Sequence, residues 1–135
     1  MAATEAFPPG VLHFPEGLPG FEGNTEFALL QDEELQPIVF LQSLGEPQVC
    51  FSVLPIQRID PKYHLRLGDD DRRLLGLPGG PEQVLNVLCL AIVNLGDGAQ
   101  PASANLFAPI VVNLDNWFAK QVIRFDSAYS AVTEV

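Results

Sequence analysis

Short apolar runs, separated by proline and glycine, follow one another along most of the chain. Three early runs are rich in β-branched and aromatic residues and are bounded by turn-forming residues: 27–30, 38–41 and 49–54. Runs of this length and composition predict β-strands. The 12 prolines and 11 glycines are spread along the sequence rather than gathered in one linker, so tight turns between short strands are expected.

The middle of the chain predicts two further strands of different character. Residues 62–67 alternate polar and apolar without interruption, which predicts a strand with one face in the core. The inward side chains are then Tyr63, Leu65 and Leu67, and the outward ones are Lys62, His64 and Arg66. Residues 84–95 are apolar on both faces through their middle, as expected of a central strand that is covered on both sides.

Beyond this central strand the chain is expected to turn back and pair with it. The turn lies at 96–98, and the returning strand at 103–113 is bulged or at an edge near Pro109, because proline cannot donate to a ladder. Residues 120–125 alternate again and are predicted to form the last strand. Helix is scarce: residues 69–75 predict one or two turns with an Asp as N-cap, and 81–83 could open another short turn.

Together these elements predict an all-β fold. We expect a small β-barrel-like or sandwich fold of about eight to ten short antiparallel strands with one or two short helical turns. The chain has no internal repeat and no linker, so residues 1–135 are expected to form a single domain, with 1–10 as a flexible N-terminal lead.

Charge narrows the class of partner. The chain has 17 acidic and 7 basic residues, a net charge of −10, and a hydrophobic share of 47% that suffices for a core. Residues 1–57 contain eight acidic residues and no Lys or Arg, which argues against direct binding of nucleic acid or an anionic membrane. A basic protein partner is favoured instead. Neither a signal peptide nor a membrane-spanning run is visible, so a cytoplasmic location is expected.

The sequence offers little catalytic chemistry. His13 and His64 lie far apart, and neither has a second ligand at metal-binding spacing. Cys50 and Cys89 sit in apolar stretches without a basic neighbour, where cysteine usually behaves as a small hydrophobe; a disulfide between them is left open. We therefore expect no enzymatic activity, no cofactor, no catalytic residue and no metal site.

One alternative keeps a chemical role. The carboxylates of Asp69, Asp70 and Asp71 are of the kind that hard cations bind, although Arg72 and Arg73 follow at once and favour a solvated helix start. The alternative is a small β-barrel that binds a ligand or hydrolyses a substrate with Asp69–Asp71 or His64.

Two stretches are more distinctive than the composition. Residues 14–22 read Phe-Pro-Glu-Gly-Leu-Pro-Gly-Phe-Glu, and residues 104–113 read Ala-Asn-Leu-Phe-Ala-Pro-Ile-Val-Val-Asn. With the segments at 38–43, 51–55 and 120–123, they resemble, in order, the flagellar assembly factor family FliW over roughly residues 11–129. The resemblance implies a small cytoplasmic β-protein without enzymatic activity. It also implies two partners, newly made flagellin and the RNA-binding translational regulator CsrA, so that flagellin level is coupled to translation of flagellin mRNA.

Charge and resemblance together suggest which residues contact a partner. An RNA-binding protein such as CsrA presents basic surface, which an acidic protein complements. The expected contacts are Leu18, Phe21 and Glu22, the acidic cluster Asp32, Glu33 and Glu34, and then Asn105, Leu106, Pro109 and Asn113. The structural alternatives are that Phe21 and Leu106 belong to the core, that Pro109 only bends a strand, and that the acidic cluster is a solvated turn. Trp117 and Phe118 either form an exposed patch or close one end of the fold.

Overall fold

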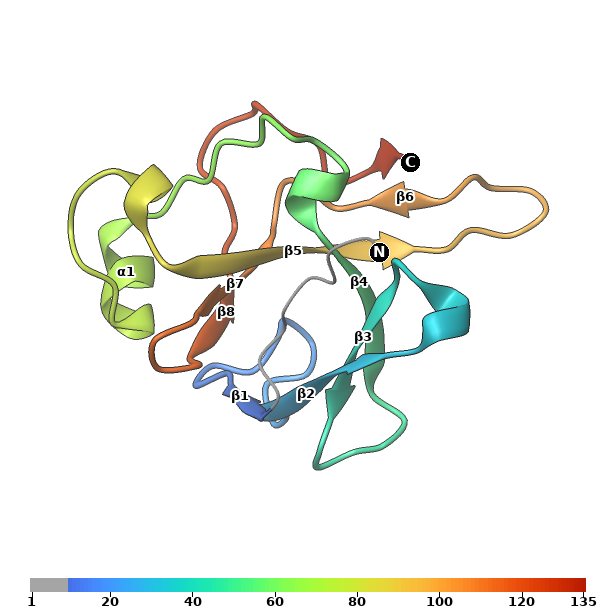
Figure 1. The fold of residues 1–135 in the computed structure, drawn as a ribbon, viewed down its shortest axis with the longest axis horizontal. Coiled ribbons are helices and arrows are strands. Elements are labelled where there is room, and N and C mark those ends of the chain that lie inside the picture. The colour runs from blue at the N-terminus through green and yellow to red at the C-terminus, as the bar shows by residue number, and fades with distance from the viewer. Residues whose placement is uncertain (1–9) are drawn as a thin grey trace.

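The computed structural model describes residues 10–135, so the expected flexible lead lies outside the described residues except for Gly10. Nine strands in antiparallel pairs dominate this part of the chain (Figure 1), which confirms the all-β prediction. The strands are β1 Val11–His13, β2 Glu26–Gln31, β3 Val39–Ser43, β4 Cys50–Pro55, β5 Val87–Asn94, β6 Ser103–Ala104, β7 Ile110–Asn113, β8 Ala119–Gln121 and β9 Thr133–Glu134.

The sheet has a branched order. Its path runs β1-β2-β3-β4-β5-β6-β9, while β7 pairs with β5 and β8 pairs with β7. An isolated bridge between His13 and Phe118, with the His13 N–H donating to the Trp117 carbonyl at 2.9 Å, brings β1 next to the start of β8. A single bridge is not a ladder, so the sheet curls towards a barrel without closing into one.

The core consists of two apolar clusters on either side of β5. Leu90 belongs to the first cluster with Phe14, Phe27 and Ile110, whereas β5 residues such as Ala91 belong to the second. Because successive side chains of a strand point to opposite faces, one strand can serve both clusters. The prediction of a central strand covered on both sides is therefore confirmed, with bounds of 87–94.

The returning strand is split in two. β6 and β7 both pair with β5, but residues 105–109 between them form no ladder. The Asn105 side chain bends the chain here, since its Oδ1 accepts hydrogen bonds from the N–H groups of Phe107 and Ala108 at 3.0 Å. Pro109, at the end of this loop, is where the sequence predicted the irregularity.

The prediction of a strand at 62–67 is wrong. The segment pairs with no other strand, but its alternation is real, with Tyr63 and Leu67 buried and His64 exposed. Side chains of other segments fasten it instead of a ladder: the Tyr129 hydroxyl accepts from the His64 N–H at 3.1 Å. Alternation of polar and apolar residues indicates that one face of a segment is buried. It does not indicate whether another strand lies beside the backbone.

The prediction that 120–125 is the last strand also needs correction. β8 ends at Gln121, and the last strand is the short β9. After β8, burial does not follow polarity: the charged Arg124 is buried, whereas the apolar Ile123 and Phe125 are exposed.

The helices are few and short, as expected. α1 spans Asp69–Leu75, and three 3-10 turns occur at η1 Glu33–Leu35, η2 Ile56–Arg58 and η3 Glu82–Val84. The N-cap of α1 is Gly68 rather than an Asp, and the Asp71 carboxylate accepts from the Gly68 N–H at 3.3 Å. Gly76 ends the helix with a φ of 70°, a conformation that glycine adopts without steric cost.

Candidate partner-binding surface

The early loop at 14–22 closes one end of the first core cluster. Phe14 is fully buried, with its ring 5.1 Å from that of Phe27, and Leu18 is only 2% exposed. Leu18 was expected to contact a partner, but its burial makes it part of the core. Phe21 is 39% exposed and Glu22 is exposed, so these two remain on the surface.

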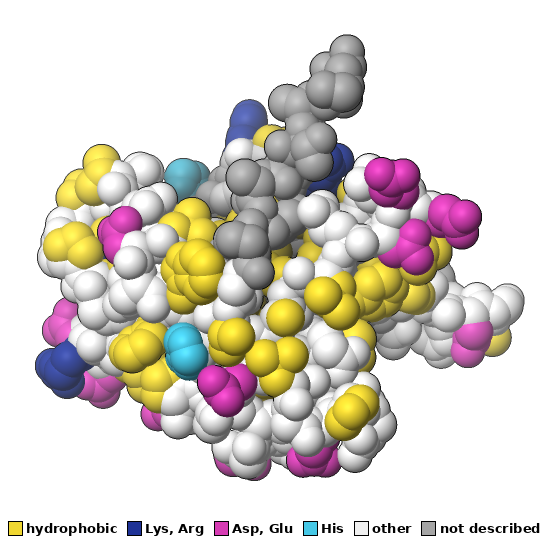
Figure 2. Space-filling model, turned by 60° about the horizontal axis from the view of Figure 1, so that its bottom comes forward, with side chains coloured by type: hydrophobic (Ala, Val, Ile, Leu, Met, Phe, Trp, Pro, Cys, Tyr) yellow, Lys and Arg dark blue, Asp and Glu magenta, His cyan; other side chains and the backbone are white. Residues whose placement is uncertain are grey.

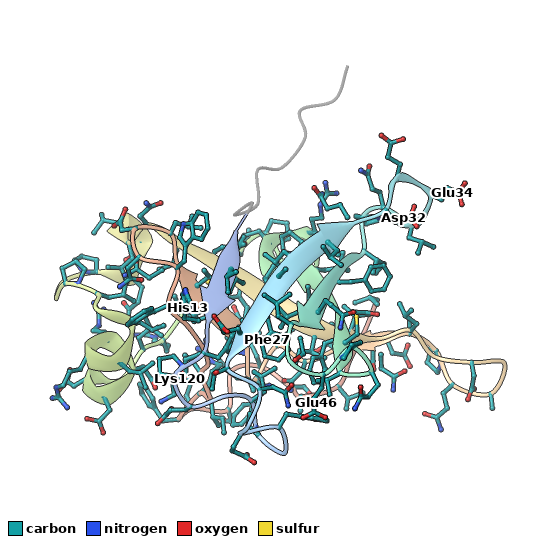
Figure 3. All side chains as sticks on the ribbon, turned by 90° about the horizontal axis from the view of Figure 1, so that it is seen from below. His13, Phe27, Asp32, Glu34, Glu46 and Lys120 are labelled. Atoms are coloured by element: carbon teal, nitrogen blue, oxygen red, sulfur yellow. The ribbon has the colours of Figure 1, made fainter. Side chains whose placement is uncertain are left out.

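A lysine fastens this loop to α1 and β8. Lys120 Nζ lies 3.3 Å from Glu16 Oε1 and 2.7 Å from Asp71 Oδ1. Partial burial alone would lower the pKa of Lys120, but the two carboxylates outweigh it and raise that pKa. Figure 3 shows Lys120 on the same side of the molecule as His13. The cation therefore holds three segments together, and Asp71 is already partnered.

The late stretch serves the fold rather than the surface. Leu106, Pro109 and Asn113 are buried. The Asn113 Nδ2 donates to the Leu75 carbonyl at 2.8 Å, and its Oδ1 accepts from the Asp115 N–H at 2.9 Å. Asn105 is half-buried and occupied by its own loop. The polar side chains of this stretch thus form hydrogen bonds inside the protein, and its buried side chains have little accessible surface.

The acidic cluster forms an exposed turn between β2 and β3. Asp32, Glu33 and Glu34, hereafter the acidic turn, are all exposed, and Figure 3 shows Asp32 and Glu34 projecting from the end of β2. The Asp32 Oδ1 accepts from the Glu34 N–H at 2.9 Å, which caps η1. The Asp32 carboxylate thus has a role in the turn itself, whereas the side chains of Glu33 and Glu34 are exposed to water.

A shallow hollow lies at the opposite end of β2. It has a volume of about 460 Å³ and is lined by His13, Phe14, Pro15, Thr25, Glu26 and Phe118. His13 and Glu26 are cross-strand partners, with His13 Nδ1 3.9 Å from Glu26 Oε2. The His13 and Phe118 rings meet edge to face at 6.2 Å. The hollow therefore combines an aromatic wall with a carboxylate.

The two aromatic residues Trp117 and Phe118 lie in different environments. Trp117 packs against the first core cluster, whereas Phe118 is 38% exposed in the hollow. Trp117 closes the end of the fold, and Phe118 contributes to the surface.

Between the hollow and the acidic turn lies the outer face, formed by the outward side chains of β1, β2 and β3. Leu12, Phe27 and Leu41 point into the core, so their neighbours along each strand point outward. The outer face comprises Val11, His13, Glu26, Ala28, Leu30, Phe40 and Gln42. Figure 2 shows hydrophobic side chains gathered in the middle of this side of the molecule, with acidic and some basic side chains around them.

Sequence reasoning missed the outer face. The signal was present in β2, because Ala28 and Leu30 are apolar on the face opposite to Phe27 and Leu29. An exposed apolar patch on the outer side of a sheet is typical of an interaction surface. Its members could not be grouped without the strand register.

Two carboxylates of the chemical alternative already have partners, since Asp70 pairs with Arg73 and Asp71 pairs with Lys120. His64 lines a separate cavity of about 330 Å³ with Gln57, Arg66 and Glu82 among its walls. Within residues 10–135 no group of three or more His, Cys, Asp or Glu side chains could hold a metal ion. The described part of the chain therefore supplies no observation that favours a metal-dependent reaction.

The two cysteines are free thiols. Cys50 is exposed on β4, whereas Cys89 is buried on β5. Burial raises the pKa of Cys89 to about 12, so its thiolate is nearly absent at neutral pH. Because the thiolate is the reactive form, Cys89 has the character of a core residue.

The family model, the related sequences and the solved structure that match this chain all belong to one family. The family model described as "FliW protein" matches residues 2–135. "Flagellar assembly factor FliW" from Carboxydothermus hydrogenoformans is 34% identical over 113 residues, covering 84% of this chain and 71% of the relative. The protein of the same name from Bacillus subtilis is 31% identical over 120 residues, covering 89% of this chain and 81% of the relative.

The chain spans just under two thirds of the length of one relative and matches a solved structure closely. Against the Nitratidesulfovibrio vulgaris protein of the same name, identity is 36% over 119 residues, which is 87% of this chain but only 66% of the relative. The crystal structure of the flagellar assembly factor FliW superposes with a TM-score of 0.82 at 31% identity, covering 97% of this chain and 89% of that one. None of the helices within residues 10–135 has the length and apolarity needed to cross a membrane.

Proposed function

The chain belongs to the FliW family of flagellar assembly factors, and we propose that it acts in the cytoplasm by binding flagellin and antagonising CsrA. In this role it performs no reaction of its own. When flagellin is bound, less of the protein is available to CsrA, and CsrA represses flagellin mRNA. When flagellin is exported, the protein is released and relieves that repression.

The observation that carries this proposal is the acidic, partly apolar surface around β2. Residues 1–57 supply no Lys or Arg, and the described members of this segment include the exposed acidic turn and Glu26 in the hollow. A CsrA-type protein that binds RNA carries basic surface, so the two proteins attract each other. A bound acidic protein also lowers the affinity of its basic partner for phosphate by adding negative charge nearby.

The proposed contacts follow from exposure. Of the residues expected from the sequence, we retain Phe21, Glu22 and the acidic turn as direct contacts, because all are accessible. Phe21 stands on the Phe51 ring, with centroids 5.3 Å apart, and is thus held in place for contact. A half-exposed aromatic side chain of this kind contributes binding energy at low entropic cost.

A co-elution experiment tests the proposal. The purified protein is mixed with CsrA and, separately, with flagellin at micromolar concentration, and each mixture is run on size-exclusion chromatography in low and moderate salt. Co-elution with both partners is expected, with the CsrA complex weakened by salt. If neither partner co-elutes in either buffer, the proposal is overturned.

A second measurement tests antagonism. A fluorescent RNA carrying the leader of flagellin mRNA is bound to CsrA, and the protein is then titrated in. Release of RNA is expected, and added flagellin should reverse it. Binding to CsrA without release of RNA would contradict the antagonist role.

A further inference from the structure

The outer face lies bare within residues 10–135. Figure 3 looks onto β1 and β2, and no described helix or strand lies in front of them. Leu30 is 49% exposed there, and its register partner on β3 is Phe40. An apolar row of this kind, left in water on one side of a sheet, is commonly covered by another layer of secondary structure.

On β2 and β3, which carry the apolar row, recognition must use side chains. β2 pairs with β1 on one edge and with β3 on the other, and β3 also has neighbours on both edges. Their backbone N–H and C=O groups are therefore engaged in ladders, and a partner strand finds no free edge here. A helix needs no backbone partner and packs against a sheet through its apolar stripe.

The charges on the face show a definite arrangement. One end of β2 carries Glu26 in the hollow, and the other end leads into the acidic turn. From Glu26 to Asp32 the chain advances six extended residues, or about 20 Å. Ala28, Leu30 and Phe40 lie between these acidic ends.

We propose that the outer face is the docking site of an amphipathic helix of a protein partner, lying along β2, with basic side chains near both of its ends. A helix of about 13 residues spans the 20 Å between the hollow and the acidic turn. Its apolar stripe covers Ala28, Leu30 and Phe40. This inference rests on the proposed function, since the basic partner of that function supplies the helix.

The hollow is suited to one cationic side chain of that helix. A Lys or Arg entering it meets the Glu26 carboxylate and the exposed ring of Phe118. Carboxylate attraction and cation–π attraction then act on the same group. At the far end, the acidic turn attracts a second basic residue in a more exposed setting, where it adds to the rate of encounter more than to affinity.

Charge also argues against a second copy of the chain as occupant. A two-fold symmetric dimer would place the same face on both sides of the interface. The acidic turn of one copy would then face either the acidic turn or Glu26 of the other, and acid would meet acid. A basic helix avoids this repulsion.

Binding of CsrA to surface variants tests the proposal. Leu30→Arg places a cation in the apolar row, and Glu26→Lys reverses the charge of the hollow. Leu95→Arg is the matched control, because Leu95 is 57% exposed but lies beyond the end of β5, on the hairpin to β6 (Figure 1). Glu134→Lys on β9 controls for the change in net charge.

Both outer-face variants are expected to weaken CsrA binding by about tenfold or more, as for residues at the centre of an interface. Both controls should stay within about twofold of the original protein. Circular dichroism and thermal unfolding of every variant establish that each is folded. A synthetic amphipathic helix of about 13 residues with basic side chains near both ends should displace CsrA from the original protein. The same peptide should not bind the Leu30→Arg variant.

The outcomes separate this inference from the proposed function. If the original protein binds neither CsrA nor flagellin, the proposed function fails. If it binds CsrA and the two outer-face variants bind equally well, only the docking site is overturned. Loss of flagellin binding without loss of CsrA binding in Leu30→Arg would overturn the assignment to the basic partner. A dimer of the free protein that Leu30→Arg dissociates would assign the face to a second copy.

Discussion

The guanidinium of Arg124 lies inside the protein, although its neighbours along the chain predict the reverse. Its side chain is 2% exposed, and it forms two hydrogen bonds to Asp126, at 2.8 and 3.0 Å. It also donates to the Tyr63 hydroxyl and the His64 carbonyl, and lies 4.7 Å from the ring centroid of Tyr129. One side chain thus links the C-terminal segment to the segment at 62–67.

Arg124→Ala is expected to lower the free energy of unfolding by about 2–4 kcal/mol. The substitution removes a buried guanidinium and leaves its hydrogen-bond partners Asp126, Tyr63 and His64 without their donor. Urea denaturation measures the change. Arg73→Ala is the control, because Arg73 pairs with Asp70 in water at 2.7 Å and should contribute less than about 1 kcal/mol. Equal losses for the two variants would contradict the assigned role of Arg124.

The same ion pair predicts a dependence on pH. The Arg124 guanidinium holds the pKa of Asp126 below its usual range. A lowered folded-state pKa means that the pair stabilises the fold above the unfolded value of about 3.9 and loses this contribution as pH falls through the folded-state pKa. In Asp126→Asn, the free energy of unfolding should vary less with pH below about 4. Denaturation curves from pH 5 to acid measure this, and unchanged acid sensitivity would contradict it.

At the scale of elements, the turn between β7 and β8 holds the end of α1. The Leu75 carbonyl accepts from Asn113 Nδ2 at 2.8 Å and from Asn116 Nδ2 at 3.1 Å. These bonds satisfy one of the carbonyls that a helix C-terminus leaves without an internal partner. The C-terminus of α1 is thus fixed to the end of β7, which lies 38 residues further along the chain.

Asn113→Ala is expected to cost about 1–3 kcal/mol of unfolding free energy, because buried groups lose partners. Asn86→Ala is the matched control, since exposed Asn86 donates to Asp115 on the same turn at 2.9 Å and should cost no more than about 0.5 kcal/mol. Thermal or urea unfolding compares the two. If Asn113→Ala were fully stable and defective only in partner binding, the structural role of this stretch would be refuted.

At the scale of the whole molecule, the acidic turn and Glu26 lie at the two ends of one strand, β2. Most described cations are fastened to carboxylates or carbonyls, as Lys120, Arg72 and Arg124 illustrate. The acidic turn and Glu26 lie in the part of the chain without Lys or Arg. A field of one sign on one side of a protein steers an oppositely charged partner.

The double variant Glu33→Lys with Glu34→Lys is therefore expected to slow association with CsrA by up to about tenfold in low salt. The difference should shrink as added salt screens the exposed charges. Stopped-flow kinetics measure the rates. Asp70→Lys with Glu134→Lys changes net charge equally but away from β2, and an identical slowing by this control would show that only net charge matters.

Local patterns predicted much of the fold. The runs at 27–30, 38–41, 49–54 and 84–95 and the helix at 69–75 all correspond to elements of the structure. The strand at 62–67 failed because a ladder needs a neighbouring backbone, which no local pattern reports. Leu18, Leu106, Pro109 and Asn113 were predicted as partner contacts and are buried, because sequence could not separate residues that hold the fold from residues that meet a partner.

By itself the sequence determined the all-β class, the family and a segment of 57 residues without a basic side chain. Those properties follow from composition and from neighbours along the chain. Only the tertiary structure decided that His13 lies beside Glu26, that Leu30 lies beside Phe40, and that both pairs share a face. Cross-strand neighbours are fixed by register, and register depends on contacts between residues that are distant in sequence.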